Sequence, residues 1–419
     1  MAASLSRPPV WDICEEHLDE AAWLWGEWEA SLDSAVYSLA EVAAGPEERL
    51  LAHLDGLVLG GVDVAEGLLV PSLASDEPGL VAAATWTLVE AEDADHQDKV
   101  FEALASAVPP VRAAMVRALG LSGRTDISRL IPLWEKGAPA VRAAVMELFS
   151  PREPGWVRER VQAALRSGNL ALVSAAVRAV RDARDEIFKD HLQLAMQIED
   201  PAVWRLAISA GLMLGSKLSR EICRAVADTQ GPAGRFALGL LASSSEPADR
   251  ASVRAKLANP ELMVDAIWAL GFSGEVESAD LILQSMERAG QVAGEAFSAI
   301  TGIVIDGAFR KPGQPIGPDD DELAIDAPPP ELRSENDLPE PALAAVQAWW
   351  AKERGRFNPG VRYLYGQPRS EASLRAALLN GPTWRREVFV VEAALSKIDL
   401  PTLSLQGWAK DQIKRLLSG

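Results

Sequence analysis

Residues that commonly bind metals are few and scattered in this sequence. The chain has four histidines: His17, His53, His96 and His191. None of them lies at helical spacing from another, and the Glu16 and His17 pair alone supplies too few ligands for a metal ion. Cys14 and Cys223 are far apart and show no CxxC spacing, so neither a disulfide framework nor a zinc site is indicated. The local pattern predicts no metal site and favours a reducing compartment.

Two other features bear on ligand chemistry. The run Asp319, Asp320, Asp321 and Glu322 offers the oxygen ligands that divalent cations prefer. It lacks the glycine turn and the alternating spacing of a calcium loop, so we interpret it as a solvated linker. The sequence also contains no GxxxxGKS or GxxxxGKT loop, no GxGxxG after a strand and no GxSxG elbow. We therefore predict no catalytic residue and no cofactor.

A group of aromatic and basic residues in the C-terminal part of the chain suits protein docking. Its members are Trp349, Trp350, Phe357, Arg362, Tyr363 and Tyr365. Tryptophan, tyrosine and arginine are enriched among the residues that dominate the binding energy of protein interfaces. Packing of a displaced terminal repeat onto the repeat array explains the same residues slightly better. Both interpretations stay open at this point.

The elements that must position these residues follow one repeating pattern. Eight segments share a turn residue, often proline, then an apolar anchor and a helix rich in small residues. The anchors are Val81, Val111, Val141, Leu172, Val203, Gly234, Leu262 and Val292, at spacings of 28 to 31 residues. Proline at the first helical turn costs no hydrogen bond, so it marks the helix starts. Shorter amphipathic stretches lie between these segments, so each period is predicted to be a helical hairpin.

Such hairpins cannot cover their own apolar faces and must stack. The predicted fold is therefore all-α, an α-solenoid of HEAT-like hairpins with about 30 residues per repeat. We divide the chain into an N-terminal helical cap (1–60), a repeat array (61–302), an acidic, proline-rich linker (303–341) and a C-terminal helical region (342–419). The last region includes GPTWRREVFVVEAALS, which matches the repeat template. Together with the preceding helical segment SEASLRAALLN it is predicted to be a displaced terminal repeat, with QGWAKDQIKRLLSG as the closing helix.

The net charge restricts the partners. At −19, the chain would repel a nucleic-acid backbone, which requires a basic surface to displace its counterions. The sequence has no signal-peptide core and no apolar run long enough to span a membrane, so we expect a cytoplasmic protein that binds neither nucleic acid nor membrane. A protein is the expected partner.

The charges are unevenly distributed along the chain. Residues 1–77 carry 16 acidic and 2 basic side chains, whereas residues 342–419 carry 6 acidic and 12 basic side chains. Opposite charges of this kind can steer a partner or drive salt-sensitive self-association at low ionic strength. Two solvated faces without a binding role are the alternative.

The PPVRAA and PAVRAA helix starts, with a period near 30 residues, resemble the HEAT-like repeats of the bacterial type that also occur in phycobilin lyases. The resemblance covers roughly residues 60–302. It implies that the arginine after each anchor bonds to an acidic or carbonyl group of the adjoining repeat. Arg112, Arg142, Arg235 and Arg385 are accordingly expected to be structural.

A further resemblance spans nearly the whole chain. The segments EEHLDEAAWLW, ERLLAHLDGL and FNPGVRYLYG, together with the repeats, resemble a proteobacterial HEAT-like repeat family whose genes often lie near type VI secretion clusters. That family has no established activity, so the resemblance implies an accessory or adaptor role in a secretion machine.

These observations lead to one main hypothesis and one alternative. The main hypothesis is a non-catalytic scaffold for protein–protein interaction, an adaptor or chaperone accessory to a type VI secretion system. The alternative is a HEAT-repeat enzyme or lyase that acts on a bound small molecule or base. An enzyme would show ionisable groups clustered in one pocket, whereas a scaffold would show an extended binding surface.

Overall fold

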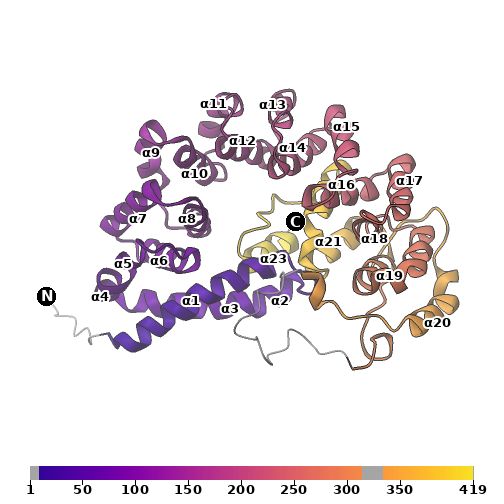
Figure 1. The fold of residues 1–419 in the computed structure, drawn as a ribbon. Helices are drawn as coiled ribbons and strands as arrows, with labels where there is room; N and C mark the ends of the chain where they lie inside the picture. Colours follow the sequence, from indigo (N-terminus) through magenta and orange to yellow (C-terminus); the bar gives the residue numbers. More distant parts are fainter. Residues whose placement is uncertain (1–8, 314–333, 419) are drawn as a thin grey trace. The chain divides into compact units, whose positions relative to one another are not determined.

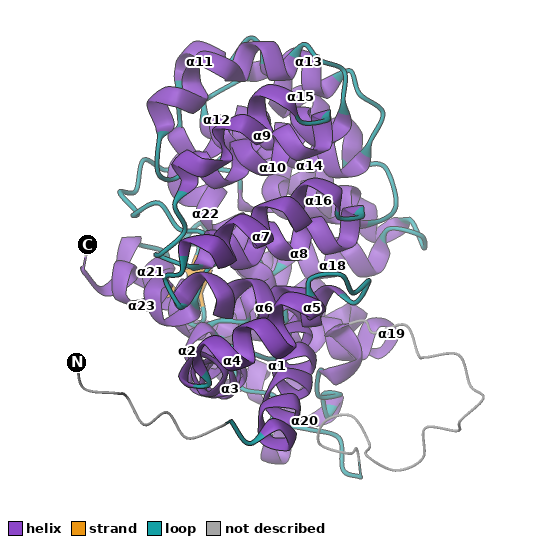
Figure 2. Ribbon diagram, turned by 90° about the vertical axis from the view of Figure 1, so that its left-hand side faces the viewer, coloured by secondary structure: helices purple, strands orange, loops and turns teal. Residues whose placement is uncertain are grey.

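The computed structural model describes residues 9–313 and 334–418, and these residues are mostly helical (Figure 1). Within them the strands are limited to β1 (Tyr363–Leu364) and β2 (Gln367–Pro368), which form one short antiparallel hairpin, orange in Figure 2. The prediction of an all-α chain is confirmed. The contacts divide the chain into two compact units. Unit 1 comprises residues 1–32, 40–199 and 402–414, and unit 2 comprises residues 33–39, 200–401 and 415–419.

Helices in unit 1 pack in chain order. Helix α1 (Trp11–Ser31) contacts α3 (Pro46–Leu59) and α6 (Pro78–Glu90), and α6 is followed in space by α8 (Pro109–Leu121), α10 (Pro139–Phe149) and α12 (Leu170–Ala183). A second layer contains α7 (Ala94–Ser106), α9 (Ile131–Lys136) and α11 (Pro154–Leu165) (Figure 1). The remaining elements are α2 (Leu39–Ala44), α4 (Gly61–Val64), a π-helical turn (Ala65–Leu69), α5 (Val70–Ser72) and α13 (Leu192–Met196).

Helices in unit 2 follow the same order of packing. Helix α14 (Pro201–Met213) contacts α16 (Pro232–Ser243), which contacts α18 (Met263–Leu270), and α18 contacts α19 (Val276–Thr301). Helices α15 (Lys217–Val226) and α17 (Pro247–Ala255) pack beside α16. Non-helical backbone angles at Ala289 and Gly290 kink α19 and separate the two stretches that the sequence pattern treats as different helices.

The recurring anchors lie in the cores of the two units. All eight anchor residues are buried, from Val81 and Val203, at 0% and 1% exposure, to Leu172 at 7%. Proline occupies the first turn of α6, α8, α10, α14 and α16 as expected, and the side chain of Asp200 caps α14 by accepting hydrogen bonds from the N–H groups of Ala202 and Val203. The template in the sequence thus predicts both where these helices begin and which face they bury.

The C-terminal region adds further helices to unit 2. These are α20 (Leu343–Glu353), α21 (Glu371–Asn380) and α22 (Arg386–Leu395). Helix α22 packs on α14 and α16, and α21 packs on α22. The two helices predicted for the displaced terminal repeat are therefore present, although α22 is preceded by a 3-10 turn at Thr383–Arg385.

The two flanks of the predicted acidic linker contact each other. An isolated antiparallel bridge joins Arg310 to Pro341, and the Ala342 N–H donates to the carbonyl of Phe309 at 2.7 Å. Gln291 of α19 donates to the carbonyl of Leu338 at 2.7 Å. The stretch 314–333, with the carboxylate run 319–322, lies outside the described residues.

In each unit an early segment of the chain meets a late one. In unit 1 the indole of Trp408 lies 4.8 Å from that of Trp28 and 6.3 Å from that of Trp25, measured between ring centroids. Beside them the fully buried carboxylate of Glu47 accepts hydrogen bonds from the Trp28 indole and from the first backbone N–H groups of α23 (Ala409–Ser418). In unit 2 the hydroxyl of Thr383 accepts from the N–H of Ser34 at 2.8 Å.

Among the described residues no helix combines the length and the apolar character that crossing a bilayer requires.

The contacts of Glu47 lead to a stability prediction. Glu47→Ala leaves the indole N–H of Trp28 and the first N–H groups of α23 without their acceptor inside the core, so we expect a loss of about 3 kcal/mol in unfolding free energy. Glu48→Ala, at the exposed neighbouring position, should change it by less than about 0.5 kcal/mol. Urea unfolding followed by tryptophan fluorescence measures both. Equal effects would show that these hydrogen bonds do not anchor the C-terminal segment.

Candidate functional site

The predicted aromatic docking group forms a packed row in unit 2. Trp350 is 4% exposed, and its indole N–H donates to Asp280 at 2.8 Å. Its ring meets Phe297 of α19 edge to face, with the centroids 5.2 Å apart, and Phe357 at the same centroid distance. Trp349 stacks on Trp350 and is half-buried. The two tryptophans thus attach α20 to α19.

One of the two tyrosines, Tyr363, continues this row. Tyr363 is 5% exposed and packs edge to face on Phe357, which is itself 6% exposed. Tyr365 is half-buried, and burial raises the pKa of its hydroxyl. The structure brings the group together, but mainly through internal contacts, as the packing interpretation describes. Contact with a partner stays a prediction for Trp349 and Tyr365, which retain some exposed area.

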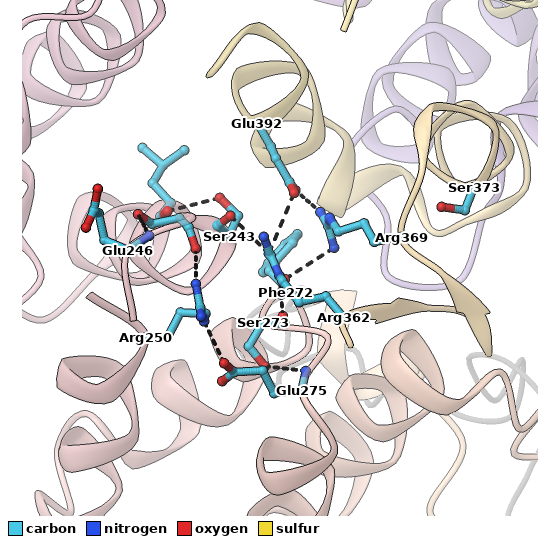
Figure 3. A network of polar contacts seen from close by, with 12 residues as sticks. Ser243, Glu246, Arg250, Phe272, Ser273, Glu275, Arg362, Arg369, Ser373 and Glu392 are labelled. Atoms are coloured by element: carbon cyan, nitrogen blue, oxygen red, sulfur yellow. Dashed lines mark hydrogen bonds and ion pairs between the residues drawn. The ribbon is translucent and has the colours of Figure 1, made fainter. Parts of the chain in front are cut away.

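Arg362, the last member of the group, belongs to a buried ionic network. Arg362 and Arg369 flank the β1–β2 hairpin, and both reach Glu392 on α22, as Figure 3 shows. The Arg362 guanidinium lies 3.6 Å from Oε1 of Glu392, and Arg369 pairs with Oε2. Glu392 is only 3% exposed. Two guanidinium groups therefore share one enclosed carboxylate.

Arg362 is also bound to the ends of two helices. Its Nε donates to the carbonyl of Ser273 at 2.7 Å, and its Nη2 donates to the carbonyls of Ser243 and Phe272 at 3.0 and 3.1 Å (Figure 3). These carbonyls lie at and just after the C-terminal ends of α16 and α18, where no intrahelical donor remains and the helix dipole favours a cation. Arg362 thus joins the hairpin to both helices.

Burial opposes the positive charge of this pair. Burial, helped by nearby Arg250, lowers the pKa of Arg362 to about 10. The pKa of Arg369 is lowered well below its ordinary value by burial and then by Arg362. Glu392 is therefore needed to keep the two cations in place, because a buried charge without a partner is costly.

Arginines bind the ends of helices elsewhere in both units. In unit 2, Arg250 donates to Glu275 at 2.8 Å and to the carbonyl of Ser244 at 2.6 Å. In unit 1, Arg152 donates to the carbonyl of Ser122 at 2.7 Å. These guanidinium groups, like that of Arg362, tie one helix end to the next element.

The four arginines expected to be structural make contacts of the expected kind. Arg112 donates to the carbonyl of Leu104 at 3.3 Å, and Arg142 to that of Glu135 at 3.1 Å. Arg385 is fully buried, with its Nε 2.6 Å from Oε1 of Glu295. Arg235 lies 3.8 Å from Asp265 and between two indole rings, those of Trp268 and Trp384, at 4.7 and 5.0 Å.

Two shallow pockets accompany these elements. One in unit 2, of about 450 Å³, adjoins Arg369 and Glu392 and is also lined by Ser370, Glu371 and Leu374. Its two arginines are already committed to Glu392 and to helix carbonyls, so the pocket offers no free cation for an anionic ligand. The other, of about 510 Å³ in unit 1, lies between α11 and α12, and the ion pair of Arg158 and Asp185 lies among its lining residues.

The strongest surface candidate is the exposed side of α1 in unit 1. We define the α1 outer face as Asp12, Ile13, Glu16, Glu20, Trp23 and Glu27. Trp23 is 56% exposed and Ile13 is 50% exposed, whereas Trp25 and Trp28, on the opposite side, are buried. At 3.6 residues per turn these six positions share one side of the helix, so two large apolar side chains stand among four carboxylates.

The sequence predicts a helical cap for this region and an acidic charge that can steer a partner, but it does not single out Trp23. The helical period could have identified this residue, because it places Trp23 on the opposite side of the helix from the buried Trp25 and Trp28.

Comparison with known proteins identifies no family for this chain. No protein-family model matches the chain, and no match is found among curated proteins. The described residues therefore carry the functional argument.

The carboxylate of Glu392, which pairs with two arginines, leads to a second prediction. Glu392→Gln leaves Arg362 and Arg369 without a counter-charge, so we expect a loss of about 3–5 kcal/mol in unfolding free energy. Adding Arg369→Met should recover part of this loss, since it removes one of the unpaired cations. Glu371→Gln, which lines the same pocket from an exposed position, should cost less than about 1 kcal/mol.

Urea denaturation of the four proteins measures these differences. A Glu392→Gln protein as stable as the parent would show that the carboxylate does not hold the two arginines in place.

Proposed function

We propose that this protein is a non-catalytic scaffold that binds another protein through the α1 outer face. The exposure of Trp23 carries the proposal. A tryptophan that is 56% exposed on a helix whose other side is well packed presents a large apolar area to water. Tryptophan is the residue type most enriched among interface hot spots.

The surroundings of Trp23 define the chemistry of the partner. Glu16, Glu20 and Glu27 lie on the same face and are exposed, and Arg49 of α3 is the nearby cation, with its guanidinium 5.8 Å from the Trp23 ring. A complementary surface carries lysine or arginine side chains around an apolar recess. Such charges increase the association rate, while the buried aromatic group supplies most of the affinity.

The repeat architecture is part of the same proposal. We infer that the helical hairpins are HEAT-like repeats and build an α-solenoid. The burial of all eight anchors and the serial packing of α6, α8, α10 and α12 in unit 1 support this inference, as does the order α14, α16, α18 and α19 in unit 2. Repeat proteins of this kind present extended surfaces, which suit protein binding.

The cellular setting follows from the sequence resemblance. The segment EEHLDEAAWLW, which helps to carry that resemblance, forms most of α1 and includes Glu16, Glu20 and Trp23. We therefore propose a cytoplasmic adaptor or chaperone accessory to a type VI secretion system, and a component of that system is the first partner to test. Salt-sensitive self-association through the same face is the competing outcome.

The test uses the full chain with a photo-crosslinking residue in place of Trp23, in cells that carry the secretion genes. Crosslinking to one basic secretion protein is the expected result. The matched control carries the same residue in place of Ile187, which is 61% exposed in unit 1 outside the α1 outer face and should give no such product.

Binding measurements on the purified pair then test the role of each group. Trp23→Ala should weaken binding by at least about 2 kcal/mol, roughly thirtyfold, without changing the fold, because the side chain is exposed. Glu16→Gln together with Glu20→Gln should slow association and reduce its salt dependence. Equal crosslinking from positions 23 and 187, or only copies of the chain as products, would contradict the adaptor proposal.

A further inference from the structure

Two of the four histidines meet between the first two long helices of unit 1. His17 lies on α1 and His53 on α3, and their Nδ1 atoms are 3.1 Å apart. The two rings stand nearly perpendicular, at 76°, with their centroids 5.1 Å apart. Both side chains are partly exposed, so the pair lies at the edge of the helix contact and is open to solvent.

Core residues of the two helices and one glycine position the two histidines. The buried side chains of Leu18 and Leu54 follow the two histidines directly and help to fix the register of α1 against α3. Gly56 provides the space, since a Cβ atom there would lie only 3.0 Å from Nε2 of His17. The ring of His17 can lie against α3 because this position has no side chain.

Charges of both signs surround the pair. Glu16 and Glu20, which belong to the acidic α1 outer face, act on His53, and Arg49 of α3 opposes them. Neutral imidazole binds metals through a ring nitrogen, so the placement of the two Nδ1 atoms decides what the pair can hold.

The separation of the nitrogens suits a shared metal ion. Zinc binds imidazole nitrogen at about 2.0–2.1 Å with tetrahedral angles, which places two such nitrogens roughly 3.3 Å apart. We propose that His17 and His53 form a two-histidine site for a first-row divalent transition metal such as Zn²⁺, Ni²⁺ or Cu²⁺. The nitrogens need to separate by only a few tenths of an ångström, and small rotations of the partly exposed rings direct both lone pairs at one ion.

The remaining coordination positions are filled by water. No group of three or more histidine, cysteine, aspartate or glutamate side chains is arranged to hold a metal in the described part of the chain. The site is thus open and exchangeable, unlike a closed structural zinc site with four protein ligands. It is independent of the protein-binding role proposed for the α1 outer face.

The experiment titrates the untagged full chain with Ni²⁺ or Zn²⁺ alone in a calorimeter. We expect one ion per chain for the parent protein, and no binding at that site after His17→Ala or His53→Ala. His191→Ala is the matched control, because it also removes a histidine of unit 1 but leaves the pair intact, and it should bind like the parent.

A second variant keeps both histidines. Gly56→Ala places a methyl group against the His17 ring and should weaken binding while circular dichroism shows an unchanged helix content. Affinities should rise from Co²⁺ to Ni²⁺ to Cu²⁺ and fall again for Zn²⁺, as expected for nitrogen ligands. Absence of binding by the parent, or equal loss in the His191→Ala protein, would overturn the site and leave a hydrogen-bonded pair only.

Discussion

Burial of one apolar face of each helix against the next is the interaction on which the rest of the structure depends. A helix as short as α10 (Pro139–Phe149) is marginal by itself, and most of its stability comes from tertiary packing. Its anchor Val141 is 3% exposed, as is Val111 one period earlier. Small residues allow this close stacking, and Gly79 shows the limit, since a Cβ atom there would lie 2.3 Å from the carbonyl oxygen of Ala22.

Close stacking brings the ends of neighbouring helices together, where the last backbone carbonyls have no intrahelical N–H donor. Arginine side chains donate hydrogen bonds to these carbonyls. Arg152 and Arg362 each reach carbonyls of more than one residue at helix ends. Many of the basic side chains are engaged in such contacts or in ion pairs. The carboxylates of Glu16 and Glu20, by contrast, are exposed on the surface.

The features that the sequence predicts well are local. The turn residue before each anchor, often proline, and the helical period after it predict helix starts and buried faces, and Val81 and Val203 lie where the template places them. The features that it does not predict join distant segments. Trp408 returns to Trp28 across 380 residues, and His17 meets His53 across 36. Local spacing contains no information about such pairs, because the register between two helices is set by their whole contact. The aromatic row at Trp350 shows the same limit, since composition alone does not separate an internal contact from a surface patch.

The composition of unit 1 has a consequence for biosynthesis. Its core includes residues 402–414, so Trp25, Trp28 and Glu47 lack their final partners until almost the whole chain has left the ribosome. N-terminal domains generally fold first during synthesis. The contacts of unit 1 with residues 402–414, however, form only after more than 200 residues of unit 2 have been translated. During that interval the aromatic and acidic groups around Trp28 and Glu47 lack the cover that Trp408 and the start of α23 provide in the finished fold. Exposed apolar surface of this kind is prone to wrong association, so the last residues translated also protect the first ones.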